Sequence, residues 1–203
     1  MKPNLNSKFK TLSVASLVLA STTACGVSDI ASDAKNLLPS GIPTSISAST
    51  LESLTAFSPS EIMFLQMMIP HHEQAVTIAA MAESQTQNAA ILDIAKRISE
   101  AQQPEIDQMK KLLTDAGLPT FMDHDMGMNG MIPQSELDKL SQVQDAAFDK
   151  LFLAAMILHH EGAIKMTSSV LDSSNPDIKQ LAENITKIQT SEIAEMKALL
   201  EIP

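Results

Sequence analysis

A His-His-Glu triplet occurs twice in the chain, at residues 71–73 and 159–161. Imidazole and carboxylate side chains transfer protons and bind metal ions. The triplets lie 88 residues apart within longer matching segments, 64–76 and 152–164, although the chain has only 5 His. Two matching triplets from so few histidines indicate an internal repeat.

A methionine precedes the second histidine of each triplet by four residues: Met68 precedes His72, and Met156 precedes His160. Residues four apart lie on one face of a helix, so a thioether and an imidazole converge there. This donor pair favours Cu(I) or Ag(I) over hard cations. The first histidine of each triplet, His71 or His159, is interpreted either as a ligand or as a surface residue.

A second matching motif, Gln-x-x-Glu-Ile-x-x-Met-Lys, occupies residues 102–110 and 189–197. Antiparallel packing would bring its methionine to the Met/His face of the preceding helix. The alternative is that these methionines fill the core and the histidines form hydrogen bonds there. The candidate ligands in the repeated segments are Met68, His71, His72, Met109, Met156, His159, His160 and Met196.

The segment between the repeats is rich in methionine and has neither a helical nor a strand period. Its candidate ligands are Met122, His124, Met126, Met128 and Met131. The pattern Met-x-His-x-Met-x-Met is similar to the soft-metal loops of exported copper-handling proteins. The alternatives are a loop that covers the end of the helices and a hard-metal site at Asp123 and Asp125.

Apolar residues at three- and four-residue steps predict four helices. We expect an all-α four-helix bundle built from two repeated helical hairpins, with a Met-rich connecting loop at 120–134. The expected boundaries are an N-cap at Ser58 or Ser60, a second helix at about 89–115, a third at about 135–172 with Ser135 and Asp138 as a capping pair, and a fourth that begins at Ser174 or Asn175.

The N-terminus has the pattern of a secretory signal peptide. Lysines precede a short apolar run, and small residues lead to Cys25, as in a bacterial lipoprotein signal. We predict a signal peptide at 1–24, a lipidated Cys25 that anchors the protein to a membrane of the cell envelope, a flexible tether at 25–54 and the bundle at 55–203. Simple export with an incidental cysteine is the alternative.

Composition excludes several classes of function. The formal net charge of −10 argues against nucleic-acid binding, which depends on clustered Lys and Arg. The single Cys excludes a multi-cysteine metal site. The chain has no Glu-x-x-His of a di-iron bundle and no Gly-x-Ser-x-Gly or phosphate-binding loop, so we do not expect an enzyme.

The two motifs, present twice and in the same order, resemble the bacterial domain-of-unknown-function family numbered 305. The resemblance covers about residues 55–203 and implies a ferritin-like helical bundle. Some relatives are exported proteins that bind copper through Met and His. We therefore predict an exported protein that sequesters or delivers copper, with Cu(I) preferred and Cu(II) or Ag(I) also admitted. A ferritin-like metal oxidoreductase and a structural or adaptor bundle without metal are the alternatives.

Overall fold

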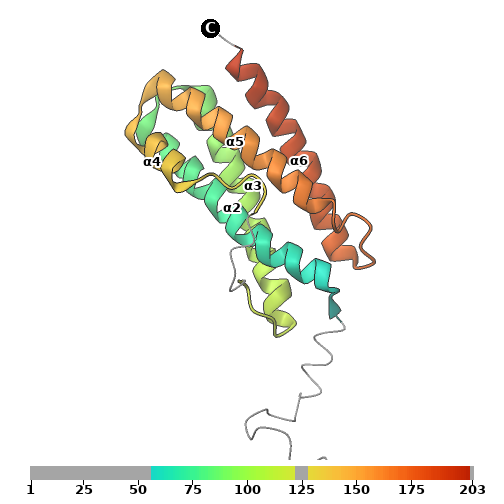
Figure 1. The fold of residues 1–203 in the computed structure, drawn as a ribbon. Coiled ribbons are helices and arrows are strands. Elements are labelled where there is room, and N and C mark those ends of the chain that lie inside the picture. The colour runs from blue at the N-terminus through green and yellow to red at the C-terminus, as the bar shows by residue number, and fades with distance from the viewer. Residues whose placement is uncertain (1–55, 122–127, 202–203) are drawn as a thin grey trace, which may run out of the picture. The chain divides into compact units, whose positions relative to one another are not determined.

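The structure is a computed structural model that describes residues 56–121 and 128–201. Its described residues form five helices and no strand: α2 (Pro59–Gln85), α3 (Ala89–Asp115), α4 (Gln134–Gln142), α5 (Asp145–Thr167) and α6 (Pro176–Leu200) (Figure 1). The all-α prediction is confirmed. None of these helices is long and apolar enough to cross a membrane. The predicted signal peptide, Cys25 and the tether lie outside the described residues.

Side-chain caps set the starts of α2 and α6 where the sequence predicts them. The backbone N–H of Glu61 donates to Ser58 Oγ at 3.3 Å, and the backbone N–H of Ser58 donates to Glu61 Oε2 at 2.6 Å. This capping box satisfies two amides that the first turn of a helix leaves unpaired. At α6, the Oδ1 atom of Asn175 accepts from the backbone N–H groups of Asp177 and Ile178.

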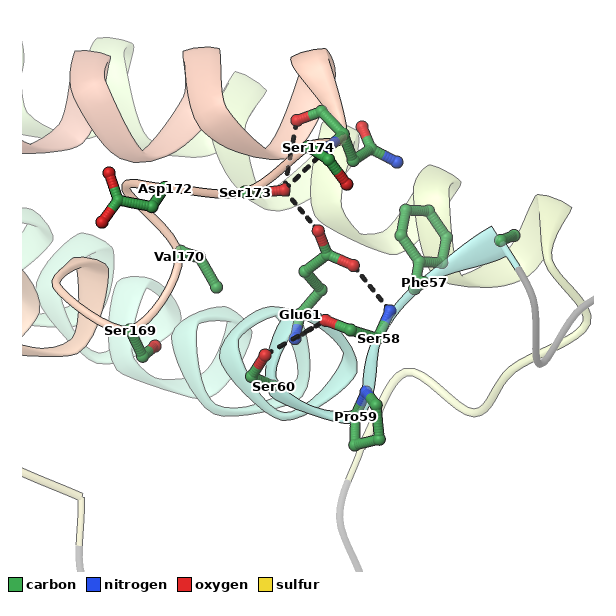
Figure 2. Close-up of a pocket in the computed structure, with 12 residues that line it drawn as sticks. Phe57, Ser58, Pro59, Ser60, Glu61, Ser169, Val170, Asp172, Ser173 and Ser174 are labelled. Carbon is green, nitrogen blue, oxygen red and sulfur yellow. Dashed lines mark hydrogen bonds between the residues drawn. The ribbon is translucent and has the colours of Figure 1, made fainter. Parts of the chain in front are cut away.

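Glu61 also ties the start of α2 to the connection between α5 and α6, where its carboxylate accepts the hydroxyl of Ser173 (Figure 2). The two segments line an open polar cavity of about 680 Å³. Burial raises the pKa of Glu61, but the hydrogen bonds from Ser173 and Ser58 outweigh it and hold the pKa below the ordinary glutamate value. The carboxylate therefore serves two structural contacts at once.

The third predicted helix is wrong in its extent, because residues 135–172 contain two helices. Val143 and Gln144 are extended, and Asp145 has a φ of 50° in the left-handed region. Leu140 of α4 and Phe148 of α5, on either side of this break, lie in the same apolar cluster.

Both ends of that predicted helix also need correction. The N-cap position of α4 is Pro133, with no side-chain capping bond, so the predicted capping role of Ser135 and Asp138 is wrong. The helix α5 ends at Thr167, and turns lead from there to α6.

The long helices form two pairs: α2 packs along α3, and α5 packs along α6 (Figure 1). The pairs meet mainly through α2 and α5. Two apolar clusters lie inside, and each takes residues from all four long helices. The first apolar cluster includes Phe64, Met68, Ile106, Met109, Ala163 and Ile185. The second apolar cluster includes Ala75, Ile78, Ile98, Phe152, Met156 and Met196.

Candidate functional site

A layer of buried polar side chains lies between the two apolar clusters. On α2, for example, Ile69 belongs to the first cluster and Ala75 to the second, and the two histidines lie between them. The same succession occurs on α3, α5 and α6. The polar layer consists of the buried residues His71, His72, Gln102, His159, His160, Gln189 and Glu192, together with Glu105, whose side chain is 13% exposed. All four histidines are 0% exposed, so the interpretation of His71 and His159 as surface residues is wrong.

The second histidine of each triplet is held by a carboxylate from the partner helix. His72 Nε2 lies 3.0 Å from Glu105 Oε2, and His160 Nε2 lies 2.8 Å from Glu192 Oε2. A carboxylate only accepts, so each Nε2 carries the proton that is donated. In the neutral ring the lone pair is then on Nδ1. Neither Nδ1 atom has a hydrogen-bond partner among the described residues.

The first histidines meet at the contact between α2 and α5. The ring centroids of His71 and His159 are 3.8 Å apart, with an angle of 41° between the ring planes. His71 Nε2 donates to the carbonyl oxygen of Asn129 at 2.9 Å. Neither ring nitrogen of His159 makes a hydrogen bond of ordinary geometry within the described part of the chain. The two rings therefore differ in how they are held.

Burial keeps the imidazoles of His71 and His159, the two central imidazoles, neutral. Burial is the main cause that lowers the pKa of His71 to about 3, and repulsion from a charged His72 adds to it. Burial is also the main cause that lowers the pKa of His159 well below its ordinary value, and repulsion from a charged His71 is the next largest cause. A contact with the backbone of His71 raises the pKa of His159 and offsets these effects only in part. A neutral imidazole keeps a lone pair that a metal ion can use.

The connection between the helix pairs passes directly over this site. The Cα atom of Gly162 lies 2.8 Å from where a Cβ atom on Gly130 would be, and a Cβ atom on Gly162 would overlap the carbonyl of Asn129. Glycine at 162 therefore lets the backbone of Asn129 come close enough to reach His71. On the other side, Gln74 exchanges two hydrogen bonds with the backbone of Ile132, at 3.0 and 2.8 Å.

The predicted thioether ligands of the helices are fully buried beside the polar layer. Met68 and Met109 lie in the first apolar cluster, and Met156 and Met196 lie in the second. All four are 0% exposed. Each cluster thus brings together two of the predicted methionines, one from each helix of a pair.

The structure describes only part of the predicted loop site. Met128 and Met131 are half-buried. Met122, His124 and Met126 lie outside the described residues. Their predicted role therefore stays a prediction.

The remaining charged residues of the motifs form ion pairs at the surface. Lys110 Nζ lies 2.6 Å from Glu73 Oε1, and Lys197 Nζ lies 2.9 Å from Glu161 Oε1. The first ion pair joins α2 to α3, and the second joins α5 to α6. The glutamate of the triplet therefore points away from the polar layer and contacts the lysine of the second motif.

Sequence reasoning did not assign a site role to four residues of the polar layer, Gln102, Glu105, Gln189 and Glu192. Their three-residue spacing in the second motif was the available signal, since it places Gln and Glu on one helix face. Within residues 56–121 and 128–201, His, Cys, Asp and Glu alone form no group of three or more suited to a metal ion. A metal site there must use thioether or amide donors as well.

Residues 61–200 match a family described as "Domain of unknown function (DUF305)". The chain belongs to this family. A DUF305 fragment from Deinococcus radiodurans is similar, with 32% identity and a TM-score of 0.66 over 70% of this chain and 96% of the other. A DUF305 protein of Streptomyces coelicolor, described as secreted, has 26% identity and a TM-score of 0.67 over 70% and 91%.

CopM in its Cu(I)-bound form is also similar, with 29% identity and a TM-score of 0.57 over 68% of this chain and 94% of CopM. CopM has also been solved with Cu(II) and with Ag. No curated protein matches this chain.

Proposed function

We propose that this DUF305 protein binds copper as its cargo and sequesters or delivers it, without catalysing a reaction. The observation that carries the proposal is the pair of histidines, His72 and His160, each held by a carboxylate through Nε2 and each presenting a buried Nδ1 atom. Ligating histidines ordinarily donate their other ring nitrogen to a carboxylate or carbonyl in this way. A buried, unpaired nitrogen is unfavourable unless something binds it.

The thioethers indicate which oxidation state these two sites prefer. Met68 and Met109 are the candidate sulfur donors for His72, and Met156 and Met196 are those for His160. Thioether and imidazole donors favour Cu(I) and Ag(I). The similarity to CopM, which has been solved with Cu(I), Cu(II) and Ag, supports copper as the ion.

The proposal includes an origin for the two sites. Matching positions of the two sequence repeats make matching contacts, His72 with Glu105 and His160 with Glu192. We infer a ferritin-like four-helix bundle that arose by duplication of one helical hairpin.

The proposal also places the protein in the cell envelope. The N-terminal sequence and the similarity to a protein described as secreted support export. We expect cleavage before Cys25 and a lipid anchor on that residue. Cys25→Ser should move the protein to the soluble envelope fraction and leave copper binding unchanged. If the unaltered protein is already soluble on fractionation, the anchor is wrong.

An anaerobic titration with Cu(I) against a competing chelator tests the copper proposal, and Ag(I) serves as a probe that does not change oxidation state. His72→Leu and His160→Leu should each lower the stoichiometry. Apo stability should stay the same or rise, because each change removes a buried polar group. Full stoichiometry together with strong destabilisation would identify the histidines as structural, as in a bundle without metal.

The loop should contribute separately to metal capacity. Changing Met122, Met126, Met128 and Met131 to Leu should lower the stoichiometry and have little effect on stability, because each change keeps an apolar side chain of similar size. Unchanged stoichiometry would limit the binding sites to the helices. A thermal unfolding curve with and without Ag(I) completes the test, since an ion that binds the native state raises its stability.

A further inference from the structure

The outer face of α5 carries an apolar stripe that the described part of the chain leaves exposed. This α5 stripe consists of Ala147, Leu151, Ala154 and Leu158, whose steps of three and four residues place them on one side of the helix. Leu151 is 39% exposed and Leu158 is 54% exposed. Beside the stripe, α4 and α5 border an open groove of about 280 Å³ that is lined mostly by apolar side chains. Such a surface suits another helix.

The matching face of the first repeat, residues 63–70 of α2, is built differently. Gln66, which matches Ala154, donates its side-chain amide to the carbonyl oxygen of Pro119 at 2.7 Å. Met67 of the same face packs against the first apolar cluster. The chain therefore binds a segment of its own over this part of α2. Ala154 has no polar side-chain group that could hold a segment in the same way.

The charges along the α5 stripe suit a second copy of the chain in one orientation. Lys150 and Glu161 lie about three helical turns apart, so both border the same edge of the stripe. In an antiparallel pair of α5 helices centred at residues 154–155, Leu151 of one copy faces Leu158 of the other. Lys150 of each copy then faces Glu161 of the other copy. A parallel pair would place each charge beside its own counterpart, and like charges repel.

The local charge also favours contact at this face over other faces. The chain has a formal net charge of −10, so two copies repel each other over most of their surface. Along the stripe, in contrast, there are two lysines, Lys150 and Lys165, and one glutamate, Glu161. Within residues 56–121 and 128–201, Lys150 forms no ion pair. Lys150 can therefore pair with a carboxylate of a second copy.

We propose that two copies of this protein associate through their α5 stripes, antiparallel and around a two-fold axis that passes between residues 154 and 155. The small side chains of Ala154 and Ala155 let the two helices approach closely at the centre. The contact is smaller than the about 20–30 residues per side of a standard interface, so we expect a weak dimer with a Kd of about 10–100 µM. The inference concerns the surface and does not rest on copper binding.

Sedimentation equilibrium tests the association in the mature protein with Cys25→Ser, so that neither a lipid nor a disulfide at that residue links two copies. Leu151→Ser should weaken association at least about tenfold, because each dimer loses two leucine contacts. Ile188→Ser is the matched control, since Ile188 of α6 is also 39% exposed, and it should leave association unchanged.

Two results of this measurement would overturn the proposal. One is a protein that stays monomeric up to about 0.5 mM, well above the expected Kd. The α5 stripe would then have another occupant, either the N-terminal residues of the chain or a different protein. The other is equal weakening by Leu151→Ser and Ile188→Ser.

Charge reversal tests the orientation with exposed residues only, so it remains decisive should Leu151→Ser not fold. Lys150→Glu and Glu161→Lys should each weaken association about three- to tenfold. The double variant should recover most of the loss, because opposite charges again face each other across the dimer. Two single variants that associate as well as the parent would contradict the antiparallel contact.

Cysteine cross-linking measures the register in the same Cys25→Ser background. A disulfide requires Cα atoms about 4.4–6.8 Å apart. Ala154→Cys lies next to the two-fold axis and should link two copies under mild oxidation. Ala147→Cys is in the same stripe but would lie about 22 Å along the helix from its counterpart, so it should not cross-link. Faster cross-linking at 147 than at 154 would identify a parallel pair and overturn the proposal.

Discussion

The two helix pairs make the same contacts at the histidines and different contacts where the connecting segment crosses them. In both pairs a buried histidine meets a glutamate of the partner helix, and a surface glutamate meets a lysine. The matching positions Gln74 and Gly162, which are 88 residues apart, are not alike. Gln74 binds the connecting segment through its amide, whereas Gly162 makes room for it.

This difference shows how one connection can contact two similar helices. The segment approaches α5 closely enough that a side chain at 162 would collide with Asn129. From there the Asn129 carbonyl reaches across to His71 on α2. Among the described residues, no carbonyl accepts a hydrogen bond of ordinary geometry from His159. His71 and His159 therefore differ in their hydrogen bonds because the single connecting segment brings its carbonyl to only one of them.

Gly162→Ala should have the largest effect on stability. The new methyl group would overlap backbone atoms of Asn129, which cannot move away as a flexible side chain can. We expect a loss of about 3 kcal/mol in the free energy of unfolding, measured by urea denaturation of the apo protein. The matched change Gln74→Ala removes two hydrogen bonds to Ile132 and should cost about 1–2 kcal/mol. Equal losses of stability in both variants would contradict the view that Gln74 holds the connecting segment by hydrogen bonds while Gly162 makes room for it.

Acid should destabilise the apo protein through its neutral central histidines. The pKa of His71 is about 3 in the folded protein and 6.5 in the ordinary case, so the unfolded chain takes up the proton first. The free energy of unfolding is therefore at its full value above pH 6.5 and decreases as the pH drops towards 3. From His71 alone, the loss at pH 5 is about 2 kcal/mol. His159 should act in the same direction, because its pKa is also lowered.

Urea denaturation between pH 7.5 and 5 measures this effect. His71→Phe and His159→Phe should each make the stability less dependent on pH, and the double variant should show the weakest dependence. If the double variant loses stability as steeply as the parent, the buried imidazoles are not the cause.

The carboxylates should affect metal binding more in the second helix pair than in the first. Glu105→Gln and Glu192→Gln keep an acceptor for the histidine and remove the charge. Each should weaken Ag(I) binding about tenfold, as loss of such an outer partner commonly does. The effect at Glu192 should be larger, because its side chain is 6% exposed and that of Glu105 is 13% exposed. A larger effect at Glu105 would show that burial of the carboxylate does not determine how much it contributes to the Ag(I) affinity.

The surface ion pairs should have the smallest effects, and these should be equal. The side chains of Glu73, Lys110, Glu161 and Lys197 are all about half exposed. Exposed pairs contribute about 0.2–1 kcal/mol, less at high salt. Double-mutant cycles on the two pairs should give the same coupling energy within that range. A coupling well above it in one pair would show that the two helix pairs differ at their surfaces as well.

Sequence reasoning predicted the helices that rest on strong local signals. The periodicity of residues 89–115 matches α3, and the caps at Ser58 and Asn175 lie where polar side chains precede a first turn. The break between α4 and α5 was missed, because residues 143–145 contain neither Gly nor Pro. Leu140 and Phe148, on either side of the break, are both buried in the second apolar cluster, which is a tertiary contact that no local pattern indicates.

For the candidate site, the sequence indicated which residue types to consider and left their arrangement open. It identified His71, His72, His159 and His160 from the repeat, and Met at helical spacing. It did not predict that His71 meets His159, because that contact joins residues far apart in the chain. Nor did it indicate Asn129, which acts through its backbone carbonyl and therefore through no feature of its side-chain type.

The composition of the two apolar clusters has a consequence for how the chain folds. Each cluster takes one end of α2 and α3 and one end of α5 and α6. A single helix pair would therefore contain half of each core and leave both halves exposed to water. Since burial of apolar surface supplies most of the driving force, neither pair should form a stable folding unit alone. The segment that repeats along the sequence is shorter than the unit that folds cooperatively, which is the whole set of helices.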